Sequence, residues 1–118
     1  MKKGLIIVAT VMSVCLFGPL HMASGTTKQK TGESLFNQFC AECHADGGNL
    51  MNPQKTLSRK DREANGIKTA EDIVNKMRNR GPFASHPSSR TTMKTFDEAT
   101  IPVDDAYRIA RYILETFQ

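Results

Sequence analysis

The five residues Cys40-Ala41-Glu42-Cys43-His44 constrain this chain more than any other feature. Two cysteines lie three residues apart, and a histidine follows directly. A disulfide between them would close a very small loop and stabilise little. A thioredoxin-like redox couple needs a βαβ setting, and the chain shows no alternating strand pattern. A structural zinc ion needs four ligands, and after residue 25 only His86 could add a further strong one.

Covalent attachment of haem c is the interpretation that remains, because C-x-x-C-H is its signature. Thiols at positions i and i+3 lie on the same side of a helical turn. Cys40 and Cys43 can therefore form thioethers with one porphyrin edge, and His44 can ligate the iron as the proximal ligand. Its second ring nitrogen should donate to an acceptor that fixes the ring plane. We expect that acceptor in the loop Gly47–Pro53.

The first 25 residues have the order of a secretory signal: two lysines, an apolar run from Gly4 to Leu20, then small residues. Gly18-Pro19 interrupts the run, which is short for a membrane span of about 20 residues. We expect a signal peptide at 1–25, a haem domain at 26–118, and a periplasmic protein without an integral membrane span. The alternative is a lipid anchor to the outer membrane through Cys15.

The charge of the chain is modest. The formal net charge is +4, and removal of the signal with its two lysines lowers it to +2. So small an excess does not indicate nucleic-acid binding. Residues 53–94 carry ten basic and four acidic side chains. This basic stretch, with Lys55 and Lys94, could dock an acidic partner, although solvated surface side chains explain it more simply.

Helical periodicity predicts an all-α domain. A first helix should start at Gly32 or Glu33 and run into Cys40, and a short one should span Lys55–Gly66. Thr69 and Asp72 resemble a capping box for a helix that Gly81-Pro82 ends. A long loop follows, from Gly81 to about Phe96. The final helix should start near Pro102 and has the best apolar stripe of the chain: Ala106, Ile109, Ala110, Ile113, Leu114 and Phe117.

Four side chains are candidates for the sixth iron ligand. Met51 lies only seven residues after His44, too near to cross to the opposite face. Met77 belongs to an apolar helix face and is better explained as core. His86 and Met93 both lie in the long loop, and either could ligate. We favour Met93 for its soft sulfur and its position just before the last helix.

These motifs resemble the class I monohaem cytochromes c, and within them the cytochrome c6 type, including relatives in metal-reducing bacteria. The resemblance covers Gly32 to Phe117, and "NPQKTLSRKDREANGI" is its most specific part. It implies three to four helices around one covalent haem, with the terminal helices crossing near Gly32, Phe36 and Tyr112. It also implies attachment at Cys40 and Cys43 and axial ligation by His44 and Met93. Lys94 replaces the proline that the family has after the ligand, and the loop before Met93 is longer.

The sequence therefore predicts an exported one-electron carrier with one iron-containing haem c and His/Met ligation. It would move electrons between redox partner proteins, with no catalytic residue and no nucleic-acid partner. The alternative is a haem sensor or peroxidase-like protein whose sixth site is open or displaceable, with His86 as a distal acid–base group. Ligation by two protein side chains leaves no site for a substrate, so the sixth ligand decides between them.

Overall fold

The computed structural model describes residues 28–84 and 93–118. The expected signal at 1–25, Cys15 and His86 lie outside these residues. The described part is helical and contains no strand, which confirms the all-α prediction. It holds five α-helices rather than three or four, because a single-turn helix directly follows the first. The helices are α1 (Gly32–Phe39), α2 (Ala41–His44), α3 (Arg59–Ala64), α4 (Ala70–Met77) and α5 (Val103–Thr116).

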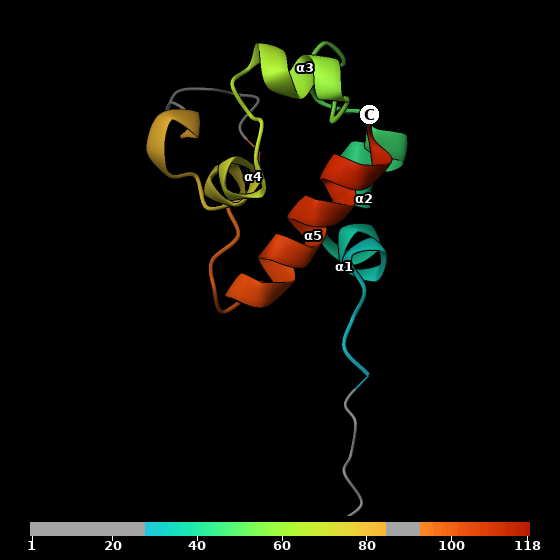
Figure 1. The fold of residues 1–118 in the computed structure, drawn as a ribbon, viewed down its shortest axis with the longest axis vertical. Coiled ribbons are helices and arrows are strands. Elements are labelled where there is room, and N and C mark those ends of the chain that lie inside the picture. The colour runs from blue at the N-terminus through green and yellow to red at the C-terminus, as the bar shows by residue number, and fades with distance from the viewer. Residues whose placement is uncertain (1–27, 85–92) are drawn as a thin grey trace, which may run out of the picture.

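The fold centres on the crossing of α1 and α5. In Figure 1, α5 runs diagonally across the view and α1 lies against it, seen nearly end-on. A Cβ atom built on Gly32 would lie 2.5 Å from the carbonyl oxygen of Arg108 and 2.9 Å from Cβ of Tyr112. The Phe36 and Tyr112 rings pack beside it, with their centroids 5.3 Å apart. The crossing that the family resemblance implied is thus present, and it depends on the missing side chain of Gly32.

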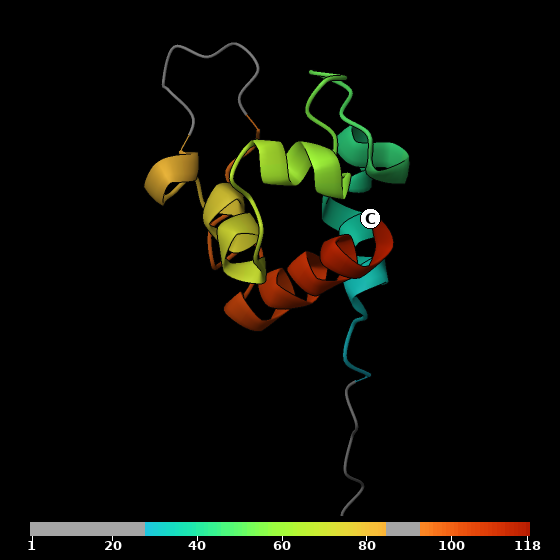
Figure 2. The same ribbon diagram turned by 45° about the horizontal axis from the view of Figure 1, so that its top comes forward.

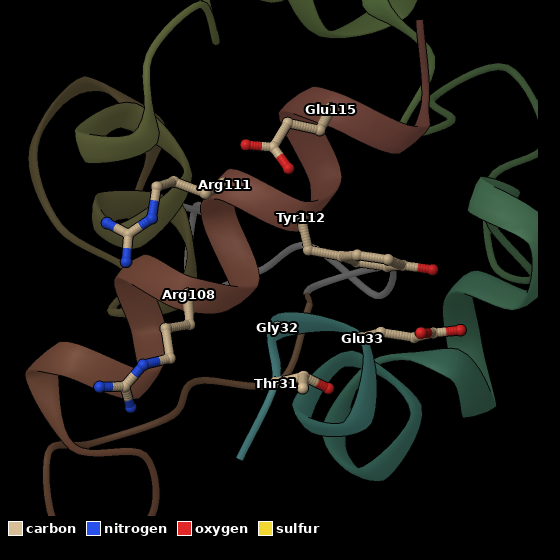
Figure 3. A pocket seen from close by; sticks show the side chains of 7 residues that line it. All are labelled: Thr31, Gly32, Glu33, Arg108, Arg111, Tyr112 and Glu115. Atoms are coloured by element: carbon tan, nitrogen blue, oxygen red, sulfur yellow. The ribbon is translucent and has the colours of Figure 1, made fainter. Parts of the chain in front are cut away.

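An open groove lies at the same crossing, between the start of α1 and the outer side of α5. Figure 3 shows its walls, which come from Thr31, Gly32, Glu33, Arg108, Arg111, Tyr112 and Glu115. None of the predicted haem-binding residues lines it, so we assign it no part in cofactor binding.

The core lies where α1, α4 and α5 meet. Leu35, Met77, Ile101 and Ile109 are fully buried. The predicted stripe of α5 faces this core: Ala106, Ile109, Ala110 and Ile113 are buried, and Leu114 and Phe117 pack against them. Met77 is core, as predicted. Because the domain is small, each of these side chains is a large share of its buried apolar surface.

Helix α4 begins as the sequence predicts. The Thr69 hydroxyl accepts from the Asp72 amide at 3.1 Å, and the Asp72 carboxylate accepts from the Thr69 amide at 2.8 Å. Hydrogen bonds from the Lys68 and Thr69 backbone amides, with the Thr69 side chain, hold the pKa of Asp72 below its usual value. The Asp therefore serves in the capping box where Glu is usual.

The end of α4 differs from the prediction. The helix stops at Met77 and not at Gly81-Pro82. Asn79 has a left-handed backbone with φ of 54°, and the Arg80 amide donates to the Asn75 carbonyl at 2.8 Å. This is a Schellman motif, in which asparagine takes the position that glycine usually holds.

The helix predicted at Lys55–Gly66 is also shorter, because Ser58 caps α3 by accepting from the Asp61 amide at 3.3 Å. Two arginines of the basic stretch are buried, with 5% of Arg62 and 6% of Arg78 exposed. The expectation that this stretch is entirely solvated is therefore wrong at these two positions. Their guanidinium groups bind backbone carbonyls, which supply the partners that a buried cation needs.

No helix among the described residues combines the length and apolar character that crossing a membrane requires.

The close approach at Gly32 predicts a stability change. In Gly32→Ala, the methyl group would press on the α5 backbone, so we expect the holoprotein to lose about 1–3 kcal/mol of unfolding free energy. Asn37→Ala, at an exposed position of the same helix, is the control and should be neutral or slightly stabilising. Urea unfolding measures both. Equal unfolding free energies for Gly32→Ala and the wild type would contradict the tight crossing.

Candidate functional site

The two cysteines and His44 come from one helical turn at the junction of α1 and α2. The Cys43 and His44 amides donate to the Cys40 carbonyl, at 3.1 and 2.9 Å. This turn brings the two thiols near each other, and both are free. Cys40 is buried and Cys43 is exposed. Burial, with a smaller contribution from nearby Cys43, raises the pKa of the Cys40 thiol to about 11. Cys40 is thus a neutral thiol in apolar surroundings.

The imidazole of His44 is held by the loop that follows it. Its Nδ1 lies 2.8 Å from the carbonyl oxygen of Gly48. A carbonyl oxygen can only accept, so Nδ1 carries the proton in this hydrogen bond. Nε2 is then the nitrogen with a free lone pair, as a metal ligand requires. The expected acceptor in the loop Gly47–Pro53 is therefore present, as a backbone group that no side-chain substitution removes.

The loop that carries Gly48 is fixed from two sides. The Leu57 amide donates to the Gly47 carbonyl at 2.7 Å, and the Gly48 amide donates to the Ala45 carbonyl at 2.8 Å. Gly47 has φ of 76°, and a Cβ atom there would lie 2.4 Å from the Phe117 ring. Figure 2 shows the C-terminal end of the chain close to α1 and α2. The end of α5 therefore presses on the loop that orients His44.

The four candidate sixth ligands are in different environments. Met77 is 2% exposed in the core, and Met51 is 60% exposed on the surface. Met93 is half-buried and packs against the same core as Cys40. His86 lies outside the described residues. The segment of Met93 also reaches the haem motif through aromatic rings, because Phe39 and Phe96 pack edge to face at 6.2 Å.

Lys94, which replaces the family's proline after Met93, is exposed. Its Nζ atom lies 5.4 Å from the centre of the Phe96 ring. A cation–π contact of this kind attracts the ammonium group to the ring face. The substitution therefore adds a surface contact to a segment that no longer has the rigidity of proline.

These donors suit a c-type haem. Two free thiols three residues apart can be joined to the two vinyl groups, and His44 offers a single free ring nitrogen. Met93 offers a thioether, a ligand type found on haem iron in cytochromes c. In the described part of the chain, no three histidine, cysteine or carboxylate side chains are grouped as the ligands of a metal ion.

Substitution of Gly47 tests the support of His44. Gly66 has a matching φ of 78°, but its nearest contact is an ordinary 3.6 Å. Gly66→Ala should cost about 1–2 kcal/mol for backbone strain alone. Gly47→Ala should cost about 1–3 kcal/mol more, from the clash with Phe117. Urea unfolding of the holoprotein measures this difference. In a double-mutant cycle, Phe117→Ala should abolish this difference. Equal losses of unfolding free energy for Gly47→Ala and Gly66→Ala, with Phe117 in place, would contradict the contact.

Comparisons with known proteins identify the family of the chain. The family model described as cytochrome C oxidase, cbb3-type, subunit III matches residues 27–113. Cytochrome c6 of Cyanidium caldarium is 39% identical over 79 residues, which is 67% of this chain and 72% of the relative. Cytochrome c6 of Pyropia yezoensis is 37% identical and covers 67% and 71%. The structure of OmcF, an outer membrane cytochrome from Geobacter sulfurreducens, aligns with a TM-score of 0.61 at 42% identity, over 74% of this chain and 99% of that one. The chain therefore belongs to the class I monohaem cytochromes of the cytochrome c6 type, electron carriers and not enzymes, with one covalently bound haem c.

Proposed function

We propose that this electron carrier holds its haem through thioethers at Cys40 and Cys43, with His44 and Met93 as axial ligands. The observation that carries the proposal is the hydrogen bond from His44 Nδ1 to the Gly48 carbonyl at 2.8 Å. It fixes the tautomer and limits rotation of the ring, so that Nε2 is the nitrogen offered to iron.

The two cysteines have unequal environments in this proposal. Cys40 faces the core and Cys43 faces solvent. In each thioether, the thiol sulfur bonds one vinyl carbon and the thiol hydrogen is added to the other, so no separate oxidant is needed. The group would therefore be held by one buried residue and one exposed residue.

Met93 completes the set as the sixth ligand. Its half-buried position against the core limits access of water to the sulfur. A thioether ligand favours the ferrous state and raises the reduction potential. When bound, the haem would supply a centre that gains or loses one electron, and His44 and Met93 would hold its iron in both states. No side chain then has to move a proton or bind a substrate.

The redox partners of the carrier are other proteins, and the described residues include no membrane-spanning helix. We infer from the exposed cations Lys55 and Lys94 that an acidic surface on a partner would be favoured. Long-range attraction of this kind raises association rates more than it strengthens the complex.

The sixth ligand can be tested on the purified ferric holoprotein. Methionine ligation gives ferric haem a weak red absorption band, and we expect the wild type to show it. Met93→Ala should remove the band, because Met77 is buried in the core between helices and Met51 lies exposed on the surface. Met51→Ala, which changes an exposed methionine, and His86→Ala should both retain it.

Carbon monoxide binding tests whether the sixth position is open. The ferrous wild-type protein should bind it poorly and the Met93→Ala variant readily, since only the variant has an open site. A wild type without the band that binds carbon monoxide readily would support a sensor or peroxidase-like function instead. A wild type that lacks the band and does not bind carbon monoxide would assign the sixth position to His86.

We also propose that residues 1–25 are removed on export and that 26–118 form the periplasmic haem domain. The charged start, the apolar run and the small residues before position 26 support this. Intact-mass analysis of protein expressed in a haem-c-maturing bacterium should give a chain that starts at Thr26 and carries one haem. A mass that includes a lipid on Cys15 would show the outer-membrane anchor and contradict a free periplasmic form.

A further inference from the structure

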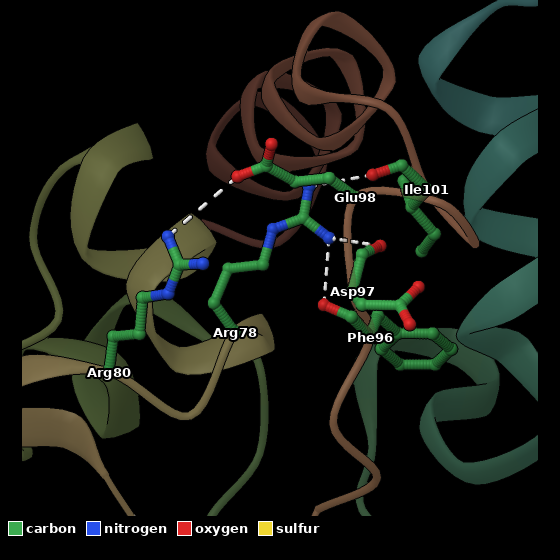
Figure 4. A network of polar contacts seen from close by, with 6 residues as sticks. All are labelled: Arg78, Arg80, Phe96, Asp97, Glu98 and Ile101. Carbon is green, nitrogen blue, oxygen red and sulfur yellow. Dashed lines mark hydrogen bonds and ion pairs between the residues drawn. The ribbon is translucent and has the colours of Figure 1, made fainter.

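Arg78 is a buried cation whose guanidinium group binds three backbone carbonyls of one segment. Only 6% of the residue is exposed. One terminal nitrogen donates to the Phe96 carbonyl at 2.7 Å and to the Asp97 carbonyl at 2.6 Å, and the other donates to the Ile101 carbonyl at 2.6 Å. Figure 4 shows the guanidinium group reaching from the end of α4 into the turn that these carbonyls form.

The same segment is tied to α4 by its backbone. The Phe96 amide donates to the Met77 carbonyl at 2.9 Å, directly before Arg78 in the chain. Phe96 itself is buried. Residues 96–101 are therefore fixed to the end of α4 at several points, and this anchored segment starts three residues after Met93.

Only an arginine can make this set of contacts. Its planar group presents donors on separate nitrogens in a fixed geometry, whereas lysine offers a single ammonium nitrogen. An ion pair between Arg80 and Glu98 also links α4 to the segment, but at 3.8 Å with both side chains more than half exposed. Exposed pairs of this kind contribute little. The buried guanidinium group is thus the main polar connection between α4 and the segment that follows Met93.

We propose that Arg78 is the positioning residue for the sixth ligand. By holding residues 96–101 against α4, it keeps the Met93 sulfur in place and limits how often the sixth position is open to an external ligand. This inference rests on the proposed ligation by Met93. It assigns Arg78 a function that is separate from general stability, because the carbonyls it binds belong to the segment of the ligand.

The chain provides a matched control in Arg62. This second buried arginine is 5% exposed and also binds only backbone carbonyls. It donates to Leu57 at 2.8 Å and to Phe117 at 3.2 Å, away from residues 96–101. Arg62→Lys and Arg78→Lys both leave a cation that reaches fewer carbonyls, so the two variants should lower the unfolding midpoint in urea to a similar degree.

The experiment compares these variants as ferric holoproteins, with imidazole as the external ligand. An external ligand binds only molecules whose sixth position is open, so its apparent affinity follows the open fraction. Loss of one hydrogen bond to a charged group should raise the affinity of Arg78→Lys for imidazole about tenfold or more. The red band should weaken in the same variant. In Arg62→Lys, the imidazole affinity should match the wild type, because Arg62 binds Leu57 and Phe117, on the side of His44, and not residues 96–101.

Hydrogen exchange gives a second measurement, which does not depend on the ligand. The Phe96 amide should exchange faster in Arg78→Lys than in Arg62→Lys, because its segment opens locally. If Arg78→Lys does not yield folded holoprotein, Arg78→Gln replaces it with a neutral amide, and the same changes are expected in smaller degree.

Two results would overturn the proposal. One is an equal imidazole affinity of the Arg78 and Arg62 variants, and the other is an unchanged hydrogen-exchange rate of the Phe96 amide in either Arg78 variant. Failure of the proposed ligation is a different result, because it would appear in the wild type. A band that is absent there, or that persists in Met93→Ala, would remove Met93 as the ligand without any comparison of the arginines.

Discussion

The absence of a side chain at Gly32 is the constraint on which the rest of the structure depends. It lets the backbone of α1 pack directly against α5, with no room for a side chain between Gly32 and the Arg108 carbonyl or the Tyr112 side chain. α1 continues directly into the turn with Cys40, Cys43 and His44, so the crossing also fixes where that turn lies. α5 in turn contributes buried side chains to the core. Phe117, directly after α5, contacts the loop that orients His44. One tight contact thus places the haem motif relative to everything that packs around it.

Irregular segments make up much of the described part of this chain, and main-chain groups hold them in place. His44 is oriented by a carbonyl, and both buried arginines bind carbonyls and not carboxylates. Hydrogen bonds of a buried cation to several carbonyls satisfy both the charge and the acceptors, which would otherwise be costly to bury. Such bonds constrain loops without requiring a strand or a further helix. A small domain can therefore keep long segments between helices and still give its ligands fixed positions.

The sequence was sufficient to locate several helices and the loop that supplies the acceptor for His44. Periodicity located α1 and the buried face of α5, and the spacing of Thr69 and Asp72 located the start of α4. The acceptor for His44 could be assigned to a short loop, because a glycine-rich turn there had backbone groups to offer. These features depend on neighbours within a few residues, which a single sequence contains.

Features that depend on distant contacts were missed. Arg62 and Arg78 look like ordinary surface cations, since nothing near them in the sequence indicates that carbonyls from elsewhere surround them. The early end of α4 was missed for a local reason, because the helix was expected to end at Gly81-Pro82 and Asn79 takes a left-handed conformation before them. The ligand assignment between His86 and Met93 depends on how the chain between them is placed, which composition does not determine.

The burial of Cys40 has a consequence for the order of haem attachment and folding. Once α5 has closed over α1, this thiol is 7% exposed and out of reach of a large reagent. With haem attached at this position, the thioether has to form while the chain is still open. For a haem attached at Cys40, the covalent step would therefore come before the packing of α5 against α1.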